Sequence, residues 1–515
     1  MKFKTFFLSA ATIVCAASAM AEPFTLDYGV ALEANGGPDE FAPYYMSSLR
    51  NGRITSGRGA NLDIAIKHPI DFAKRFSYEF TVEGIGRVGN KINYERYFAD
   101  EQTWGCNSRR TSNVWLHQLY ATVKFRGVFL TAGLTEFHSK LLNERLSSGD
   151  ISESSNTRPI PGARIGFIDF QNIPFTNGWV QIQGAIGYYK STDNDWQEDR
   201  YNYWNYHINQ GWWYNYKNLY FRTKPSENFS VTFGMQACAQ FSGDTRRYRH
   251  GVHTSTEKHP LRFHDFFDML IPREGETYVI GNHVGSWDLQ LRYRLHDGSE
   301  IKAYMQSPWE DGSGVGKLNG WDGLWGLEWK PKTSPTSRNA ISGAVLEFVT
   351  FMNQSGPIHY DPDDHPGTTL TGDRATGADN YYNNSWYNGY AIYGRSIGTP
   401  MCPQPVLNTD GATTIFLQNR FWGIHAAVEG DILSNLSYRV MANYRRYYGS
   451  TFIPAINPSH SVSAMLEANW HLIRVPQLKF GARFAFDAGN SIYGRNFGVL
   501  VSATYTGLFK FKSNN

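Results

Sequence analysis

The chain has 515 residues, with 49 basic side chains against 46 acidic ones and a formal net charge of +3. Such a balanced charge gives no reason to expect a nucleic acid or a strongly acidic partner. Aromatic residues make up 15% of the sequence, yet the mean hydropathy is only −0.44. Beyond the N-terminal segment no run of about 18 apolar residues predicts a membrane-spanning helix. This combination suits a transmembrane β-barrel, whose strands average out to polar because one face lines the lumen.

The N-terminal segment has the three parts of a secretory signal peptide. Lys2 and Lys4 form a basic start, residues 6–17 are apolar, and the small-x-small run AMA follows. We therefore expect residues 1–21 to be a signal peptide and residues 22–515 to form the exported domain.

The remaining cysteines, Cys106, Cys238 and Cys402, are odd in number and widely spaced. An exported chain with this pattern is not built on a disulfide framework, although one bridge is possible. No C-x-x-C, H-E-x-x-H or Cys/His cluster is present, so we expect neither a metal site nor a cofactor.

Several stretches alternate strictly between apolar and polar residues, as strands do when their two faces meet different solvents. In residues 286–295, the odd-numbered side chains from Trp287 to Leu295 are apolar, whereas the even-numbered ones from Asp288 to Arg294 are polar or charged. The others are RFSYEFTVEG (75–84), NFSVTFGMQACAQF (228–241), NLSYRVMANYR (435–445), SVSAMLEANWH (461–471) and QLKFGARFAFD (477–487). One apolar and one charged face are what lipid outside and water inside require.

A soluble β-sandwich or propeller also alternates, but the predicted strands run about 9–12 residues, which matches a tilted bilayer crossing. Aromatic residues such as Trp287, Trp470, Tyr438 and Tyr444 stand near the ends of the apolar faces, as in the girdles of membrane barrels. We predict an all-β fold, a transmembrane antiparallel β-barrel of about 16–18 strands in the outer membrane of a Gram-negative bacterium. We expect it to contact outer-membrane lipid and to be a monomer.

Long irregular insertions interrupt the strands, notably at 190–216, 242–285 and 353–418. Residues 136–147 and 259–271 have the pattern of short helices. A barrel of this size has a wide lumen unless something fills it, and these segments are available to plug it.

Tests for catalytic motifs fail. GSGVGKL (312–318) lacks the first glycine and the hydroxyl residue of a phosphate-binding loop, and no G-x-S-x-G is present. DPDD (361–364) lacks the ordered ligand pattern of a calcium loop and is better explained as a solvated acidic loop. We therefore predict no enzymatic activity and no catalytic residues.

Five stretches spread over nearly the whole mature chain have a distinctive composition: LSSGDISESSNTRPIPGARI (146–165), FQNIPFTNGWVQIQGAIGYYKSTDNDW (170–196), LEFVTFMNQSGPIHYD (346–361), DNYYNNSWYNGYAIYGRSIGTP (379–400) and NFGVLVSATYTGLF (496–509). In their order and spacing they resemble the Bacteroidetes branch of the capsule-assembly Wzi proteins. The resemblance implies a plugged barrel of about 18 strands. It also implies a non-catalytic, lectin-like role in which capsular polysaccharide or another surface glycan is held at the cell surface.

The stretch at 379–400 is rich in aromatic residues separated by Asn and Gly, and it has neither strand nor helix periodicity. Aromatic rings stack on the apolar faces of sugars, while amides and arginine bind the hydroxyls. Sugar binding and packing within the plug both explain this composition. The candidate polysaccharide-binding residues are Tyr381, Tyr382, Trp386, Tyr387, Tyr390, Tyr393 and Arg395.

The alternative function is a porin or channel for small solutes. The lumen face would then carry the cations Arg292, Arg294, Lys302, Arg439, Arg445 and Arg483. In a channel these cations would favour anions. In a plugged barrel they would form an internal salt-bridge network with Asp288, Glu467 and Asp487 that anchors the plug.

Overall fold

The computed structural model describes residues 24–110, 113–193, 195–201, 203, 207–271, 281–310, 312–317, 319–334, 338–354, 379–411 and 415–511. The predicted signal peptide and the acidic run at 361–364 lie outside these residues. Within them, no helix is both long enough and apolar enough to cross a membrane.

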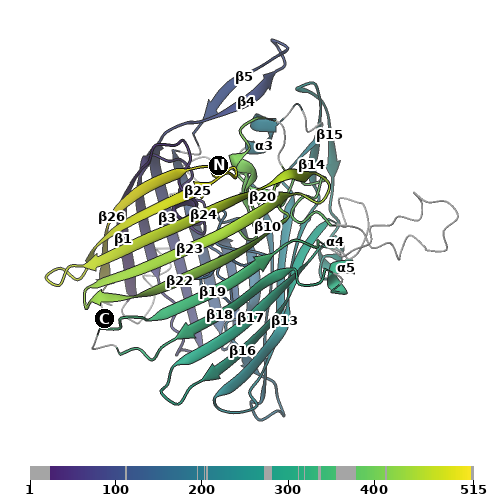
Figure 1. The fold of residues 1–515 in the computed structure, drawn as a ribbon. Coiled ribbons are helices and arrows are strands. Elements are labelled where there is room, and N and C mark those ends of the chain that lie inside the picture. The colour runs from purple at the N-terminus through teal and green to yellow at the C-terminus, as the bar shows by residue number, and fades with distance from the viewer. Residues whose placement is uncertain are drawn as a thin grey trace.

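A closed antiparallel barrel of 18 strands makes up most of the protein (Figure 1). Each barrel strand pairs with the next along the chain, and the first strand closes on the last through a register that runs from Phe24↔Phe511 to Gly36↔Val499. The barrel strands are β1 (Phe24–Gly36), β2 (Gly59–His68), β3 (Phe76–Gly89), β6 (Val114–Phe125), β7 (Val128–Leu134), β8 (Pro161–Phe167), β10 (Val180–Lys190), β12 (Trp213–Thr223), β13 (Phe229–Phe241), β16 (Asn282–Arg294), β17 (Glu300–Trp309), β18 (Gly323–Lys330), β19 (Gly343–Thr350), β22 (Phe421–Leu433), β23 (Leu436–Gly449), β24 (Pro454–His471), β25 (Leu478–Gly489) and β26 (Asn496–Phe511). The predicted fold class is confirmed.

The outer face of the wall is apolar and the inner face is polar, as the alternation in the sequence predicted. On β16, Leu291 is 39% exposed and points outward, whereas its neighbour Gln290 is only 6% exposed and points into the lumen. Other exposed residues of the outer face include Leu32, Ile64, Phe233, Leu346, Leu466, Phe484 and Val501. An apolar band around a closed barrel is stable only in a bilayer, so the protein lies in the outer membrane.

The two ends of the barrel differ. Short turns, such as residues 126–127 and 434–435, join the strands at one end, which is the periplasmic end in outer-membrane barrels. A two-residue strand, β9 (Gln171–Asn172), pairs with β10 there. Long connections gather at the opposite, extracellular end.

Several small elements stand at the extracellular rim (Figure 1). They are the hairpin β4 (Ile92–Phe98) and β5 (Thr103–Arg109), the helix α3 (Trp196–Tyr201), the sheet β11 (His207–Gln210), β14 (Gly243–Arg249) and β15 (Val252–His259), and the short helices α4 (Asp265–Asp268) and α5 (Gly312–Val315). The predicted insertions at 190–216 and 242–285 therefore contain secondary structure of their own, and each ends within a barrel strand.

A plug fills the lumen. It is made by residues 37–58 with α2 (Tyr44–Ser47), by residues 135–160, and by residues 379–411 and 415–420 with β20 (Ala391–Ile392), β21 (Arg395–Ser396) and the 3-10 helix η3 (Pro405–Leu407). The two main hydrophobic core clusters lie between this plug and the inner wall. The core of the protein is thus inside the barrel, where a channel would need water.

The prediction of short helices was wrong for residues 136–147 and largely wrong for residues 259–271. In the first segment, Asn143 Oδ1 accepts hydrogen bonds from the Arg145 and Leu146 amides at 3.1 and 3.2 Å. These bonds cap a single turn that starts at Asn143, where the Ser147 amide donates to the Asn143 carbonyl at 2.8 Å, so no helix runs through the segment. The second segment starts at the last residue of β15 and contains only the single turn of α4.

Candidate functional site

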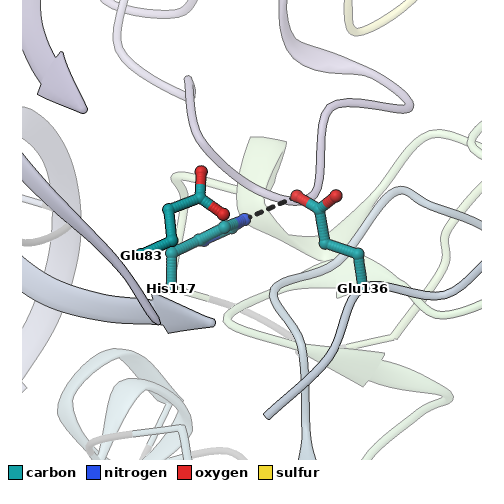
Figure 2. A group of neighbouring side chains, drawn as sticks. All are labelled: Glu83, His117 and Glu136. Carbon is teal, nitrogen blue, oxygen red and sulfur yellow. Dashed lines mark hydrogen bonds and ion pairs between the residues drawn. The ribbon is translucent and has the colours of Figure 1, made fainter. Parts of the chain in front are cut away.

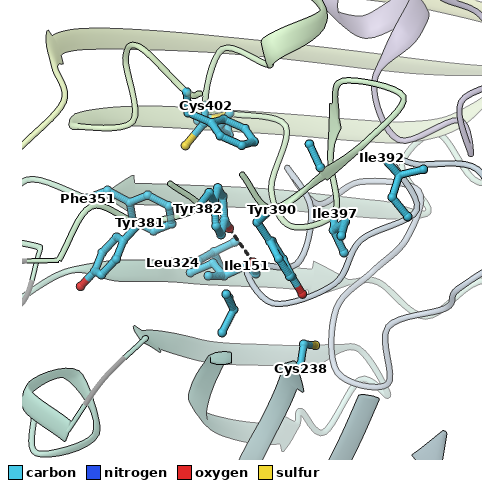
Figure 3. Packing of buried hydrophobic residues seen from close by; sticks show 14 of the residues in the cluster. Ile151, Cys238, Leu324, Phe351, Tyr381, Tyr382, Tyr390, Ile392, Ile397 and Cys402 are labelled. Atoms are coloured by element: carbon cyan, nitrogen blue, oxygen red, sulfur yellow. Dashed lines mark hydrogen bonds between the residues drawn. The ribbon is translucent and has the colours of Figure 1, made fainter. Parts of the chain in front are cut away.

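The aromatic stretch at 379–400 folds into the interior of the barrel as part of the plug (Figure 3). It packs against Ile151 of the plug and against wall residues such as Cys238 and Leu324. Five of the predicted sugar-binding residues are at most 3% exposed: Tyr381, Tyr382, Tyr387, Tyr390 and Arg395. Packing within the plug therefore accounts for most of this stretch.

The tyrosine hydroxyls inside the plug bind backbone carbonyls. Tyr382 donates to the Ile151 carbonyl at 2.5 Å, and Tyr390 donates to the Ser152 carbonyl at 2.8 Å. The two rings stack with their centroids 5.5 Å apart. Burial raises the pKa of both hydroxyls well above the ordinary value, so they stay neutral donors. A ligand would have to displace these bonds to reach them.

The Arg395 side chain also forms its hydrogen bonds within the plug. Its Nε donates to the Asn156 carbonyl at 3.0 Å and its Nη2 donates to Asn156 Oδ1 at 3.0 Å. Burial lowers the pKa of Arg395 to about 10, so the side chain remains a cation at neutral pH. Arg395 thus ties the third plug segment to the second.

Only Trp386 and Tyr393 among the predicted residues are half-buried rather than buried. The guanidinium of Arg158 lies 4.8 Å from the centre of the Tyr393 ring. Sugar contact by the predicted stretch stays a proposal, and these two rings are the ones that keep some accessible surface.

The lumen arginines anchor the plug. Arg445 is 0% exposed, and its guanidinium lies 4.0 Å from the ring centre of Tyr44 and 4.4 Å from that of Tyr493. On the neighbouring wall, Asp487 Oδ2 accepts the Tyr44 amide at 2.9 Å. The turn of α2 is therefore fixed from two sides.

Glu467 is the centre of the ion pairs that the sequence predicted. It pairs with Arg439 at 2.9 Å and also with Arg483, whose Nη1 donates to the Tyr45 carbonyl at 3.1 Å. The predicted anchoring network is confirmed for this carboxylate, because the wall charges neutralise each other and still bind the plug.

Among the residues that the structure describes, Asp288 and Asp487 do not form the predicted salt bridges. Asp288 accepts hydrogen bonds from the Tyr220 hydroxyl at 2.6 Å and from the Ser286 hydroxyl at 2.7 Å. Asp487 accepts from the Ser463 hydroxyl as well as from the plug. The cross-strand neighbours of Asp288 are Gly234 and Gln306, neither of them a cation. Those of Asp487 are Ser463 and Asn496. The sequence pattern does not give this register.

Glu83, His117 and Glu136 meet inside the barrel in an arrangement that resembles a metal site (Figure 2). However, the Trp115 indole donates to His117 Nδ1 at 3.2 Å, so the other ring nitrogen, Nε2, carries the proton and donates to Glu136 at 2.9 Å. Arg53 then pairs with Glu83 at 2.7 Å and with Glu136 at 2.8 Å. The Arg53 guanidinium already neutralises these carboxylates, so we assign no metal to the group.

A pocket of about 450 Å³ opens at the extracellular rim between the β4–β5 hairpin and α3. Its lining combines a ring, an amide, a hydroxyl, a guanidinium and carboxylates: Tyr94, Asn107, Ser108, Arg109, Asp195 and Asp199. Asp199 accepts from the Tyr94 hydroxyl and pairs with Arg96, and Arg109 Nη1 lies 3.4 Å from it. These groups offer donors and acceptors to a hydroxyl-rich ligand.

The opposite face of the same hairpin carries a cluster of rings. Tyr97 and Trp104 pack at 5.6 Å between centroids, and Tyr203 packs on both at 4.4 and 5.2 Å. Trp104 is still 36% exposed. We call the pocket and this cluster together the rim site.

Sequence reasoning did not find the rim site. The alternation of aromatic and charged residues in INYERYF (92–98) was a signal for a two-faced hairpin. The Asp199 carboxylate, which binds Tyr94 of this hairpin, lies 105 positions further along the chain. Only the folded chain brings the two together.

The barrel is similar to solved outer-membrane proteins. Wzi of Escherichia coli, described as a carbohydrate-binding β-barrel involved in group 1 capsule assembly, matches with a TM-score of 0.55 and 12% identity, over 98% of this chain and 89% of that one. The fold is that of an outer-membrane β-barrel. OccAB4 of Acinetobacter baumannii and OccD3 (OpdP) of Pseudomonas aeruginosa both give a TM-score of 0.45, with 9% and 8% identity, over 96% of this chain and over 100% and 94% of theirs.

No family model matches the sequence, and no curated protein matches it.

Proposed function

We propose that this protein binds a polysaccharide of the capsular type at its extracellular end and holds it on the cell surface, without catalysis. The rim site is the proposed place of contact, with Trp386 and Tyr393 as further candidate rings. The protein would act as a monomer, since the barrel and its plug form a complete unit within one chain.

The observation that carries this proposal is the filled lumen. Core residues such as Tyr382, Tyr390 and Phe416 are at most 1% exposed and lie where a porin would hold water. A solute path would need their contacts to break, which favours retention of a ligand outside over passage through the barrel.

The chemistry of the rim site supports a carbohydrate ligand. The exposed face of Trp104 can stack on one sugar residue of the polysaccharide. On the other face of the hairpin, Asn107 and Arg109 can bind the hydroxyls of another. The carbohydrate binding described for Wzi, which shares this fold, supports the same interpretation.

The test compares cells that lack the protein with cells that carry the wild type or the double variant Trp104→Ala/Asn107→Ala. We expect deletion to leave total polysaccharide unchanged but to shift it from the cell surface to the medium. The double variant should bind purified polysaccharide about tenfold more weakly, since it loses one stacking and one amide contact.

The matched control is Trp179→Ala, because Trp179 is 54% exposed but belongs to a periplasmic loop. It should bind like the wild type. Unchanged surface retention in the deletion strain would contradict the function. Retention lost on deletion but unchanged in the double variant would contradict only the rim site.

A further inference from the structure

A second pocket, of about 290 Å³, opens on the inner wall at the periplasmic end. It is lined by the ends of β12, β13, β16 and β17 and by the turn at 224–228. Immediately above it, Gln290 and Lys302 both donate to the Leu141 carbonyl of the plug at 3.0 Å. The plug therefore covers the extracellular side of this pocket, and the turn at 224–228 places the pocket at the periplasmic end.

Four cations line this periplasmic pocket, Arg222, Lys224, Arg292 and Arg294, against two carboxylates, Glu227 and Glu300. Glu300 is already paired with Arg292 at 2.5 Å. Within the described part of the chain, neither Lys224 nor Arg294 forms an ion pair. The pocket thus keeps a net positive charge within a concave surface, which attracts anions.

One cation of this pocket, Arg222, is held in position before any ligand binds. The guanidinium of Arg222 lies 3.5 Å from the ring centre of Phe170, and its Nε donates to the Thr232 hydroxyl at 3.2 Å. Arginine presents a planar fork that matches the two oxygens of a carboxylate or phosphate. Because the stack and the hydrogen bond already order Arg222, binding costs less side-chain entropy.

The remaining lining groups are small and polar. Ser226, Asn228 and Ser230 offer hydroxyls and an amide beside the cations. A volume near 300 Å³ is at the lower end of the range for small-ligand sites. The pocket therefore suits a ligand that carries one oxyanion and several hydroxyls.

We propose that this pocket is a second, periplasmic binding site for an acidic sugar residue, a uronate or a sugar phosphate. This goes beyond retention at the cell surface, because it gives the protein a contact with anionic carbohydrate on the inner side of the membrane. The plug separates the two sites, so each binds its own segment of ligand.

The test uses the purified full-length protein in detergent and measures binding of three probes: trigalacturonate, glucose 6-phosphate and the neutral maltotriose. We expect one or both acidic probes to bind and maltotriose not to bind at the same concentration. The double variant Lys224→Gln/Arg294→Gln should weaken acidic binding by about tenfold or more. Both side chains are exposed, so the change leaves the core intact.

The matched control is Arg474→Gln, which removes an exposed cation from a periplasmic turn on another part of the rim. It should bind like the wild type. The preferred acidic probe distinguishes a carboxylate ligand from a phosphate ligand. Equal binding of maltotriose, or an equal loss in Arg474→Gln and the double variant, would overturn the proposal. Surface retention of polysaccharide is scored separately, so failure here leaves the proposed function standing.

Discussion

Glu153 shows how the plug uses a single ionisable residue. The Tyr214 hydroxyl donates to its Oε2 at 3.1 Å, beside an internal cavity of about 30 Å³ that also borders Arg164. A cavity of that size holds no more than a water or two. Burial raises the pKa of Glu153 to about 8, although the charge of Arg164 opposes the shift. The carboxyl is therefore largely protonated at neutral pH.

A carboxyl with a raised pKa stabilises the folded protein below its unfolded value of 4.5, and this contribution is lost as the pH rises through about 8. We predict that Glu153→Gln removes this loss. The variant should match the wild type near pH 5 and be more stable by about 2 kcal/mol near pH 9. Thermal unfolding at both pH values measures the difference.

Glu95→Gln is the control for this prediction, because Glu95 is exposed on the rim hairpin. Its stability relative to the wild type should not depend on pH. A Glu153→Gln variant that behaves in the same way would show that Glu153 is ionised in the folded protein.

At the scale of elements, two neighbouring arginines on strand β23 have different environments and roles. Arg445 on β23 points into the barrel and holds α2, whereas the next residue, Arg446, points outward and is exposed. Arg445 also donates to the Ser463 hydroxyl at 2.6 Å. Because successive side chains of a strand point to opposite faces, Arg445 contacts the plug and Arg446 lies on the outer surface.

We predict that Arg445→Ala loosens the first plug segment while the wall stays closed. The loss of two ring contacts and of buried hydrogen bonds should lower the local stability of residues 37–58 by about 2 kcal/mol or more. Hydrogen exchange of this segment should rise by about tenfold or more, with barrel strands unchanged. Arg446→Ala, the control, should leave exchange in the segment as in the wild type; a rise of equal size in both variants would contradict the anchoring role.

The wall could be predicted from the sequence, whereas the plug contacts could not. Strands such as β16 and β25 were visible because lipid on one side and polar groups on the other impose alternation residue by residue. The burial of Tyr382 depends on Ile151, which lies 231 positions away, and no local pattern carries that contact. The predicted helix at 136–147 failed for a related reason, since Gln290 and Lys302 of the wall bind the Leu141 carbonyl that a helix would use for its own backbone.

At the scale of the whole molecule, the plug determines whether ions and solutes can pass through the barrel. We predict that the wild type is silent in planar bilayers, because three plug segments fill the lumen. Replacing residues 379–411 by a short Gly–Ser linker should open a measurable conductance, since it removes the buried rings Tyr381, Tyr382, Tyr387 and Tyr390 from the lumen.

The control for this prediction shortens the β4–β5 hairpin, which stands beyond the rim and should leave the protein silent (Figure 1). Steady open channels in the wild type would contradict the closed state and would favour the porin function.

The hydrogen bond between the Tyr44 amide and Asp487 spans 443 positions of the chain. One partner follows the first strand and the other lies on the penultimate strand, so this bond cannot form until nearly the whole polypeptide has been delivered. The seam between β1 and β26 joins the first strand to the last, so it cannot form until β26 is present. A wall that closed before residues 37–58 were inside would enclose an incomplete core. We therefore expect the first plug segment to enter the lumen before the β1–β26 seam closes the barrel.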